Sequence, residues 1–187
     1  MIIAQQKRHE NMAEYLLYLW QVEDIIRACR LDLELIEQHI IARYDVDEAQ
    51  RIEIRDWYES LVKMMKMEGV QQSGHLQICK NVLIRLNDLH RQLLTSDKFP
   101  EYGADYYRTL PFIVELRARE GKETPTDELE TCFNALYGVL LLRLQGKEVT
   151  HDTEVAIAQI SHFLGLLSAF YKKDEEEGDL FADKIID

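Results

Sequence analysis

The chain has 187 residues, of which 47% are hydrophobic, and this size suits one compact domain with a single core. Its 34 acidic and 22 basic residues give a net charge of −12 at pH 7, which repels a phosphate backbone and makes nucleic acid an unlikely partner. Three prolines and eight glycines are few for a β-rich chain, so the composition predicts an all-α fold.

Hydrophobic residues recur at steps of three and four along most of the chain, which predicts a single-domain helical bundle of about six or seven helices. The first helix is expected over residues 10–30. A second is expected over residues 32–43, with Asp32 as the residue that caps its start. The third begins near Asp47 and ends at Gly69, because glycine commonly follows the last turn of a helix.

The fourth helix is expected to open near Ser73, and it places His90 on its apolar stripe, where a histidine is usually a core residue. Residues 97–121 are the least regular region. Its prolines separate a group of tyrosines from an apolar helix that follows Pro111 and ends at Gly121.

Thr124, Pro125 and Asp127 predict the start of the next helix, as its cap, its first residue and its third residue. This helix is expected to end at Gly146, and either Thr150 or Asp152 is expected to cap the last long helix that follows. Because both helices are apolar around much of their circumference, we expect them at the centre of the bundle. The apolar stripe of the first of them consists of Leu129, Phe133, Leu136, Leu140 and Leu144.

We expect a helical bundle domain over residues 1–173 and an acidic, then amphipathic tail over residues 174–187. No apolar run is long enough to predict a membrane span, and the N-terminus does not have the pattern of a signal peptide. Three widely spaced cysteines in apolar helical patterns predict buried free thiols: Cys29, Cys79 and Cys132. These features predict a cytoplasmic protein.

Residues 18–30 begin as the buried face of a helix but place Glu23, Arg27 and Arg30 where that face continues. Glu23 and Arg27 are one helical turn apart, a spacing at which a carboxylate and a guanidinium can pair. Two interpretations follow. The three residues form either an ion-pair seam where the helix leaves the core or a polar pocket for an anionic ligand.

Two pairs of carboxylates form the other candidate site: Glu34 with Glu37, and Glu53 with Asp56, each three residues apart. This pattern resembles the E-x-x-E and E-x-x-D signature of the all-α nucleoside triphosphate pyrophosphohydrolases. The resemblance implies that the four residues hold magnesium, a cation that prefers oxygen ligands and bridges phosphates. The alternative is a solvated acidic face, since the same spacings recur elsewhere in this acidic chain.

The segments "MIIAQQKRHENMAEYLLYLWQVEDIIRA" and "DWYESLVKMM" resemble an all-helical bacterial family, domain of unknown function 4924. The resemblance spans nearly the full chain and implies a helical bundle found mainly in Bacteroidetes, with no assigned activity or site residues. We therefore predict a binding or assembly module without catalytic activity or cofactor. It would act on a protein partner or a second copy through a helical face, and the alternative is a magnesium-dependent nucleoside triphosphate pyrophosphohydrolase.

Overall fold

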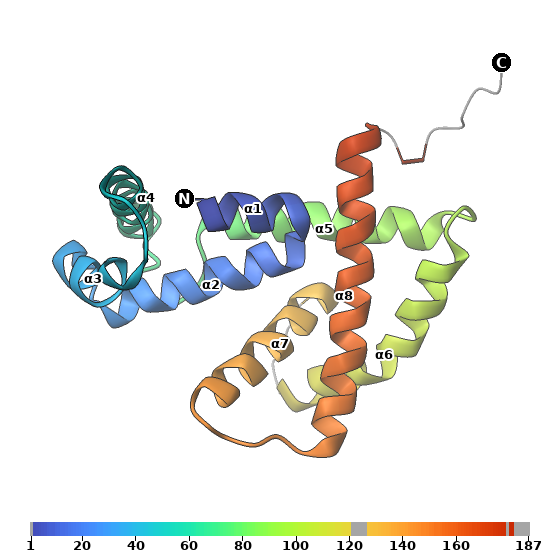
Figure 1. Cartoon of the computed structure of the whole chain (residues 1–187). Helices are drawn as coiled ribbons and strands as arrows, with labels where there is room; N and C mark the ends of the chain where they lie inside the picture. Colours follow the sequence, from blue (N-terminus) through green and yellow to red (C-terminus); the bar gives the residue numbers. More distant parts are fainter. Residues whose placement is uncertain (1, 121–126, 179, 182–187) are drawn as a thin grey trace. The chain divides into compact units, whose positions relative to one another are not determined.

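The computed structural model describes residues 2–120, 127–178, 180 and 181, and within these ranges it confirms the all-α class. The predicted number of six or seven helices is slightly too low. The described residues form eight α-helices and one short 3-10 helix, η1 (Figure 1). The elements in chain order are α1 (Ile2–Glu10), α2 (Met12–Ala28), α3 (Leu33–His39), η1 (Ile41–Arg43), α4 (Glu48–Met67), α5 (Gln77–Thr95), α6 (Pro100–Glu120), α7 (Glu128–Leu144) and α8 (His151–Glu177).

The additional helix arises at Asn11, which separates α1 from α2. The Ala13 backbone N–H donates a hydrogen bond to Oδ1 of Asn11 at 3.0 Å, so Asn11 satisfies a donor that the first turn of α2 leaves free. The prediction of one helix over residues 10–30 is therefore wrong at its start. At its other end, Arg30 and Leu31 adopt positive φ angles of 56° and 57°, which stop α2.

Local capping signals are confirmed at α3 and α4. Asp32 accepts hydrogen bonds from the backbone N–H groups at the start of α3. Asp47 and Gln50 form a reciprocal capping box at the start of α4, and Gly69 follows the end of this helix with a φ of 72°. These boundaries are set by residues next to them in the sequence.

Helix α6 continues through Pro111, where the sequence predicted a break. A proline removes one backbone hydrogen bond, but buried side chains lie on both sides of it, Tyr102 and Tyr106 before it and Ile113 after it. Their packing keeps the helix continuous. Tyr102 also shares a 2.6 Å hydrogen bond with Nδ1 of buried His90, which is the core role predicted for that histidine.

Helix α7 begins at Glu128, three residues later than predicted, because Asp127 is its cap rather than its third residue and accepts a hydrogen bond from the Leu129 N–H at 3.0 Å. Thr124 and Pro125 lie outside the described residues. Leu129 and Phe133 are fully buried, but Leu144 is 72% exposed, so the predicted apolar stripe is buried only in its first half. Of the two caps predicted for α8, Thr150 is the one that caps it, and Asp152 lies in its first turn.

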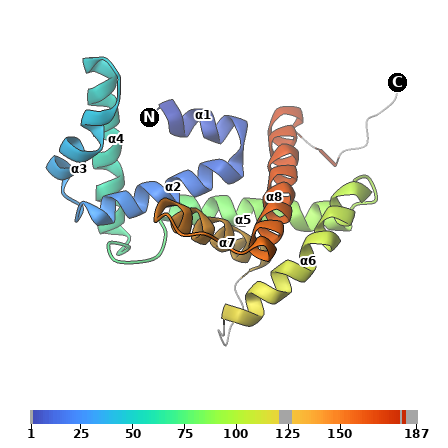
Figure 2. The same cartoon turned by 60° about the horizontal axis from the view of Figure 1, so that its bottom comes forward.

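The chain divides into two compact units, and the boundary falls inside α5. The first unit is Met1–Glu10 with Glu14–Val82, and the second is Asn11–Ala13 with Leu83–Asp187. In the first unit, α3, η1 and α4 pack together. In the second unit, α6, α7 and α8 pack against one another in all three pairs (Figures 1 and 2). These three helices frame a site described below.

The predicted tail over residues 174–187 is partly helical, because α8 continues to Glu177. Leu180 is buried, and its N–H donates to Oδ1 of Asp174 at 3.2 Å. The Phe181 ring lies edge-on to Phe99, with ring centroids 5.6 Å apart. Leu180 and Phe181 therefore pack on their own unit, while Ile185 and Ile186 lie outside the described residues.

Helix α8 is long and apolar enough to cross a bilayer when only its length and composition are considered, and among the described residues it is the one helix that meets this criterion. One-third of its most apolar window, 33%, is buried by other parts of the protein. Core helices of soluble proteins pass the same test, so the property is weak evidence of a membrane span.

Candidate functional site

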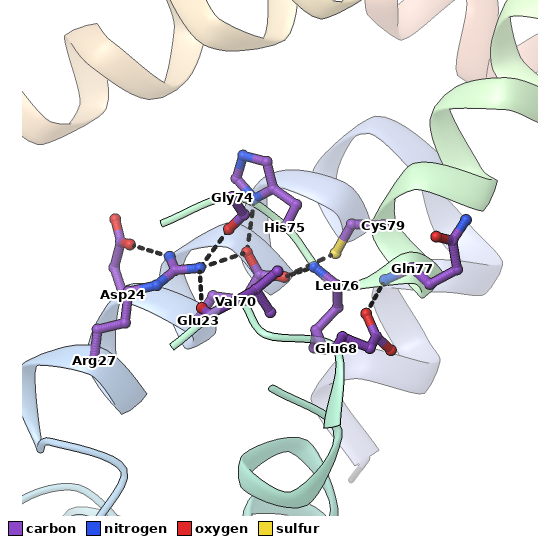
Figure 3. Close-up of polar contacts among 10 residues, drawn as sticks. All are labelled: Glu23, Asp24, Arg27, Glu68, Val70, Gly74, His75, Leu76, Gln77 and Cys79. Carbon is purple, nitrogen blue, oxygen red and sulfur yellow. Dashed lines mark hydrogen bonds and ion pairs between the residues drawn. The ribbon is translucent and has the colours of Figure 1, made fainter. Parts of the chain in front are cut away.

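Glu23 of α2 lies at the centre of a buried polar cluster in the first unit (Figure 3). The residue is 1% exposed. Its Oε1 accepts a hydrogen bond from the Leu76 backbone N–H at 2.9 Å, and its Oε2 lies 2.7 Å from Nδ1 of His75. The Cys79 thiol also lies within hydrogen-bonding distance of Oε1, at 3.4 Å. A single carboxylate thus joins α2 to the residues that open α5.

Two carboxylates satisfy the first backbone donors of α5. The Leu76 carbonyl accepts a hydrogen bond from the Cys79 N–H at 2.9 Å, so Leu76 occupies the capping position with a side chain that cannot cap. Glu23 supplies an acceptor for the Leu76 N–H instead. Glu68 does the same for the Gln77 N–H at 2.6 Å. Negative charge at this end of the helix is also favoured by the helix dipole.

Arg27 holds the loop between α4 and α5 through its guanidinium group (Figure 3). Nη2 donates to the carbonyl of Val70 at 3.2 Å and to the carbonyl of Gly74. Nη1 donates to Asp24 at 2.8 Å, and Nη2 lies 4.0 Å from Glu23. Because both Nη atoms already contact acceptors of the chain itself, these contacts favour the ion-pair seam over a pocket for an anion.

The structure brings Glu23 and Arg27 together, as their spacing indicated, but it places Arg30 elsewhere. Arg30 is exposed, in the turn that ends α2. His75 and Cys79 are 52 and 56 residues away from Glu23, and the sequence did not predict their contacts with it. No local pattern indicates a contact over that distance. Two features of the sequence were available as signals. One is a glutamate at a position where the buried face of α2 continues, and the other is the start of α5, where Leu76 has no side chain that can cap the helix.

The chemistry of this cluster is that of a structural clamp. The His75 ring stacks on buried Trp20, with centroids 4.1 Å apart and an interplanar angle of 14°. Burial, and next the Glu23 carboxylate, raise the pKa of the Cys79 thiol far above its ordinary value. A neutral buried thiol is a poor nucleophile. The combination of cysteine, histidine and glutamate therefore does not form an activated nucleophile here.

We expect Arg27→Lys to lower the free energy of unfolding by about 1–2 kcal/mol, because one ammonium cannot contact Asp24 and two loop carbonyls in the fixed geometry of a guanidinium. Urea unfolding followed by circular dichroism measures the change. Arg91→Lys is the matched control, since Arg91 is exposed and pairs with exposed Asp88. Equal effects of the two substitutions would contradict the clamp.

The four carboxylates of the predicted magnesium site lie on α3 and α4. Glu34 is exposed in the first turn of α3, and Oε2 of Glu37 accepts a hydrogen bond from Nε of Arg55 at 3.2 Å. Glu53 and Asp56 are exposed on α4. Within the part of the chain that the structure describes, no group of three or more His, Cys, Asp or Glu side chains is placed to hold a metal ion. The magnesium-dependent hydrolase stays a prediction.

A half-open, largely apolar groove of 1050 Å³ lies between α6, α7 and α8 in the second unit. Small residues, Ala135 and Gly138 of α7 and Ala156 of α8, form part of its wall. The other apolar residues that line it are Phe112, Leu116, Val139, Leu142, Val155, Ile157 and Ile160. Polar residues also line it, namely Glu115, Arg119, Asn134, Thr150, His151, Asp152 and Thr153. This groove is a candidate binding site of the second unit.

The sequence predicted a helical groove in general terms but not this one. Its periodicity placed the apolar face of α7 on the line through Leu136 and Leu140. Gly138 is about 200° of helical rotation from each of these residues, whereas Leu142 is about 40° from Gly138. The groove therefore lies on a different face of α7, and a helix that is apolar all round does not indicate which face stays open.

Comparison with known proteins identifies one family. The model of domain of unknown function DUF4924 matches residues 1–178, a range that includes α1 to α8. No curated protein and no solved structure shows a significant match to the chain. Because the family model covers nearly the entire sequence, the chain belongs to the DUF4924 family.

Proposed function

We propose that the protein is a non-catalytic binding module and that the groove between α6, α7 and α8 accepts an apolar α-helix. The observation that carries this proposal is Gly138, which lines the groove in the middle of α7. A Cβ atom added at this position meets no atom within 4 Å. Glycine inside a helix costs about 1 kcal/mol relative to alanine. No described neighbour accounts for that cost, and an occupant that approaches the α7 backbone closely would account for it, because Gly138, unlike the helical glycine Gly103 of α6, lines the groove.

The dimensions of the groove suit a helix. Its lining on α8 runs from Thr150 to Ile160, which corresponds to about 15 Å, or about three helical turns. The small side chains of Ala135, Gly138 and Ala156 allow the axis of a fourth helix to come close. A helix in such a groove is anchored by residues at steps of three and four, as in other helix-in-groove complexes.

Four of the seven polar residues that line the groove bind one another in two pairs. Nη2 of Arg119 donates to Oε1 of Glu115 at 2.5 Å on α6. The Thr150 hydroxyl accepts a hydrogen bond from the Thr153 N–H at the start of α8. Apolar contact is therefore the main interaction that the groove offers, which favours binding over catalysis. Its volume of 1050 Å³ is also at the upper end of the range of about 300–1000 Å³ for small-molecule pockets.

Filling the groove at Gly138 tests the proposal. We expect Gly138→Leu to abolish most of the fluorescence enhancement of Nile red, an uncharged apolar dye that the acidic chain does not repel. The same substitution should raise the free energy of unfolding by up to about 1 kcal/mol, because leucine favours the helix and its Cβ has open space. A variant that is more stable and yet binds less dye would show that dye binding is lost because the groove is filled, and not because the chain has unfolded.

Gly103→Leu is the matched control. Gly103 is a helical glycine of α6, a Cβ atom there also meets nothing within 4 Å, and it does not line the groove. This variant should bind the dye as the natural chain does. Equal dye fluorescence from a monomeric chain with and without Gly138→Leu would overturn the proposal.

A further inference from the structure

We infer that the occupant of the groove is a basic amphipathic helix of another protein, which places a Lys or Arg side chain next to Asp152. This inference rests on the proposed function and specifies the chemistry of the partner. Three features carry it: an unpaired acid in the lining of the groove, the position of the acids at one end of the groove, and the acidic character of the whole chain.

Asp152 is the charged residue of the lining that its own chain leaves unpaired. The described lining contains two acids, Glu115 and Asp152, and one base, Arg119, so the groove is net acidic. Nη2 of Arg119 already lies 2.5 Å from Oε1 of Glu115. Asp152 is exposed and has no hydrogen-bond or ion-pair partner among the described residues. A cationic side chain of an occupant can therefore pair with Asp152 without displacing a group of the same chain.

The start of α8 does not by itself account for an acid in the groove. The helix dipole favours acids in the first turn, where both Asp152 and Glu154 lie. Glu154 is about 200° of helical rotation from Ala156, so it meets this preference on the side of α8 that faces away from the groove. The first Lys or Arg of α8 is Lys172, about 30 Å along the helix from Asp152. The helix therefore places an acid in the groove and no base of its own beside it.

The acids of the lining lie at the same end of the groove. Helices α6 and α8 run antiparallel (Figure 1), and Nε2 of Gln159 donates to the Thr109 hydroxyl at 3.1 Å. Glu115 lies six residues after Thr109 and Asp152 lies seven residues before Gln159, so the two acids are at nearly the same level. Farther along α8, the lining over residues 155–160 is apolar. A complementary helix therefore combines an apolar stripe with a basic side chain near one of its ends.

The charge of the whole chain favours the same partner. A net charge of −12 attracts a basic segment and repels an acidic one. Arg143 is the one Lys or Arg of α7, and it lies about 140° of helical rotation from Gly138, outside the lining of the groove. An acidic helix would bring further negative charge next to Asp152. A second copy of this chain is disfavoured as the occupant for the same reason.

Two synthetic helical peptides of about 18 residues, or five turns, test the inference with the full chain. Both carry the same aliphatic residues at steps of three and four, and their polar positions are all Lys in one peptide and all Glu in the other. At physiological salt, fluorescence anisotropy should show that the Lys peptide binds at least about 10-fold more tightly than the Glu peptide. Gly138→Leu should abolish binding of the Lys peptide, because the new side chain fills the groove.

Reversal of the charge at Asp152 locates the preference. Asp152→Lys should lower the preference for the Lys peptide at least about 10-fold, because the substitution replaces an attraction at the contact with a repulsion. Glu154→Lys is the matched control, since it makes the same change of charge in the same turn of α8 but outside the lining of the groove. It should lower the preference by about 3-fold at most, because salt screens charges that are not in contact.

The outcomes separate this inference from the proposed function. Equal affinity for the two peptides, lost in both cases with Gly138→Leu, would overturn the basic partner but retain an apolar helix in the groove. Equal effects of Asp152→Lys and Glu154→Lys would also overturn it, because the preference would then come from net charge alone. A dimer in sedimentation velocity that dissociates with Gly138→Leu would overturn it and assign the groove to a second copy. A folded monomer that binds neither peptide nor Nile red would overturn the proposed function itself.

Discussion

Removal of the Glu23 carboxylate is expected to lower the free energy of unfolding by about 3–5 kcal/mol, the cost of breaking a buried charged pair on one side. In Glu23→Ala, the Leu76 N–H loses its acceptor at 2.9 Å and His75 loses its partner at 2.7 Å. Arg27 also loses the nearest buried negative charge, 4.0 Å away. The side chain of Glu23 is only 2% exposed, so water replaces few of these contacts.

Urea unfolding and amide hydrogen exchange measure this effect. The Leu76 amide should exchange faster in Glu23→Ala, because opening of the loop before α5 no longer requires breaking its hydrogen bond to Oε1. Glu23→Gln should have a smaller effect, since its amide oxygen can still accept from Leu76. Glu53→Ala is the control for removal of an exposed acid and should change stability by less than about 0.5 kcal/mol. Similar losses in Glu23→Ala and Glu53→Ala would refute the role of the cluster.

The parts of the fold that could be predicted from the sequence are those fixed by neighbouring residues. Asp32, Asp47 and Thr150 each cap the helix that follows them, because a capping bond spans only two or three residues. The contact between Glu23 and the residues around Leu76 spans 53 positions, and it depends on how α2 packs against the loop before α5. Local patterns identified the unusual glutamate but not its partners.

Tertiary packing also decided two features that local rules predicted wrongly. Pro111 lies inside α6, because buried residues on both sides of it stabilise one continuous helix. On α7, Leu144 is exposed although it continues the predicted apolar stripe, while Gly138 lines a groove on another face. Periodicity identified an apolar helix in both cases. It could not show which surfaces other helices cover.

Unfolding at alkaline pH is the other large expected effect, because the core contains many tyrosines and cysteines held in their neutral forms. Burial raises the pKa of Cys132 from its ordinary 9.0 to about 12 and that of Tyr106 from 10.0 to about 12. Burial also raises the pKa values of Tyr15, Tyr18, Cys29, Tyr58, Cys79 and Tyr102.

The direction of the pH effect follows from proton linkage. A raised pKa in the folded state means that the folded chain holds these protons more tightly than the unfolded chain does. The stabilisation is fully present below pH about 9 and is lost as the pH rises from about 9 through about 12. For Cys132 alone it amounts to on the order of 4 kcal/mol, since one pKa unit corresponds to about 1.4 kcal/mol. Several such groups together exceed the usual stability of a domain, about 5–15 kcal/mol.

The slope of stability against pH provides a sharp test with a matched control. Urea unfolding between pH about 9 and about 11 should show a steep fall in the free energy of unfolding, and Cys132→Ala should reduce that slope by up to about 1.4 kcal/mol per pH unit, because one linked proton is removed. Val139→Ala truncates another buried residue of α7 and should lower stability equally at every pH, with the slope unchanged. We expect the helical circular dichroism signal to fall together with the ionisation of the buried tyrosines, since their phenols ionise only when the core opens. Ionisation near pH 10 of Tyr58 and Tyr102, which are 1% and 0% exposed, in a chain that stays fully helical would mean that water reaches these side chains in the folded protein, which their burial does not allow.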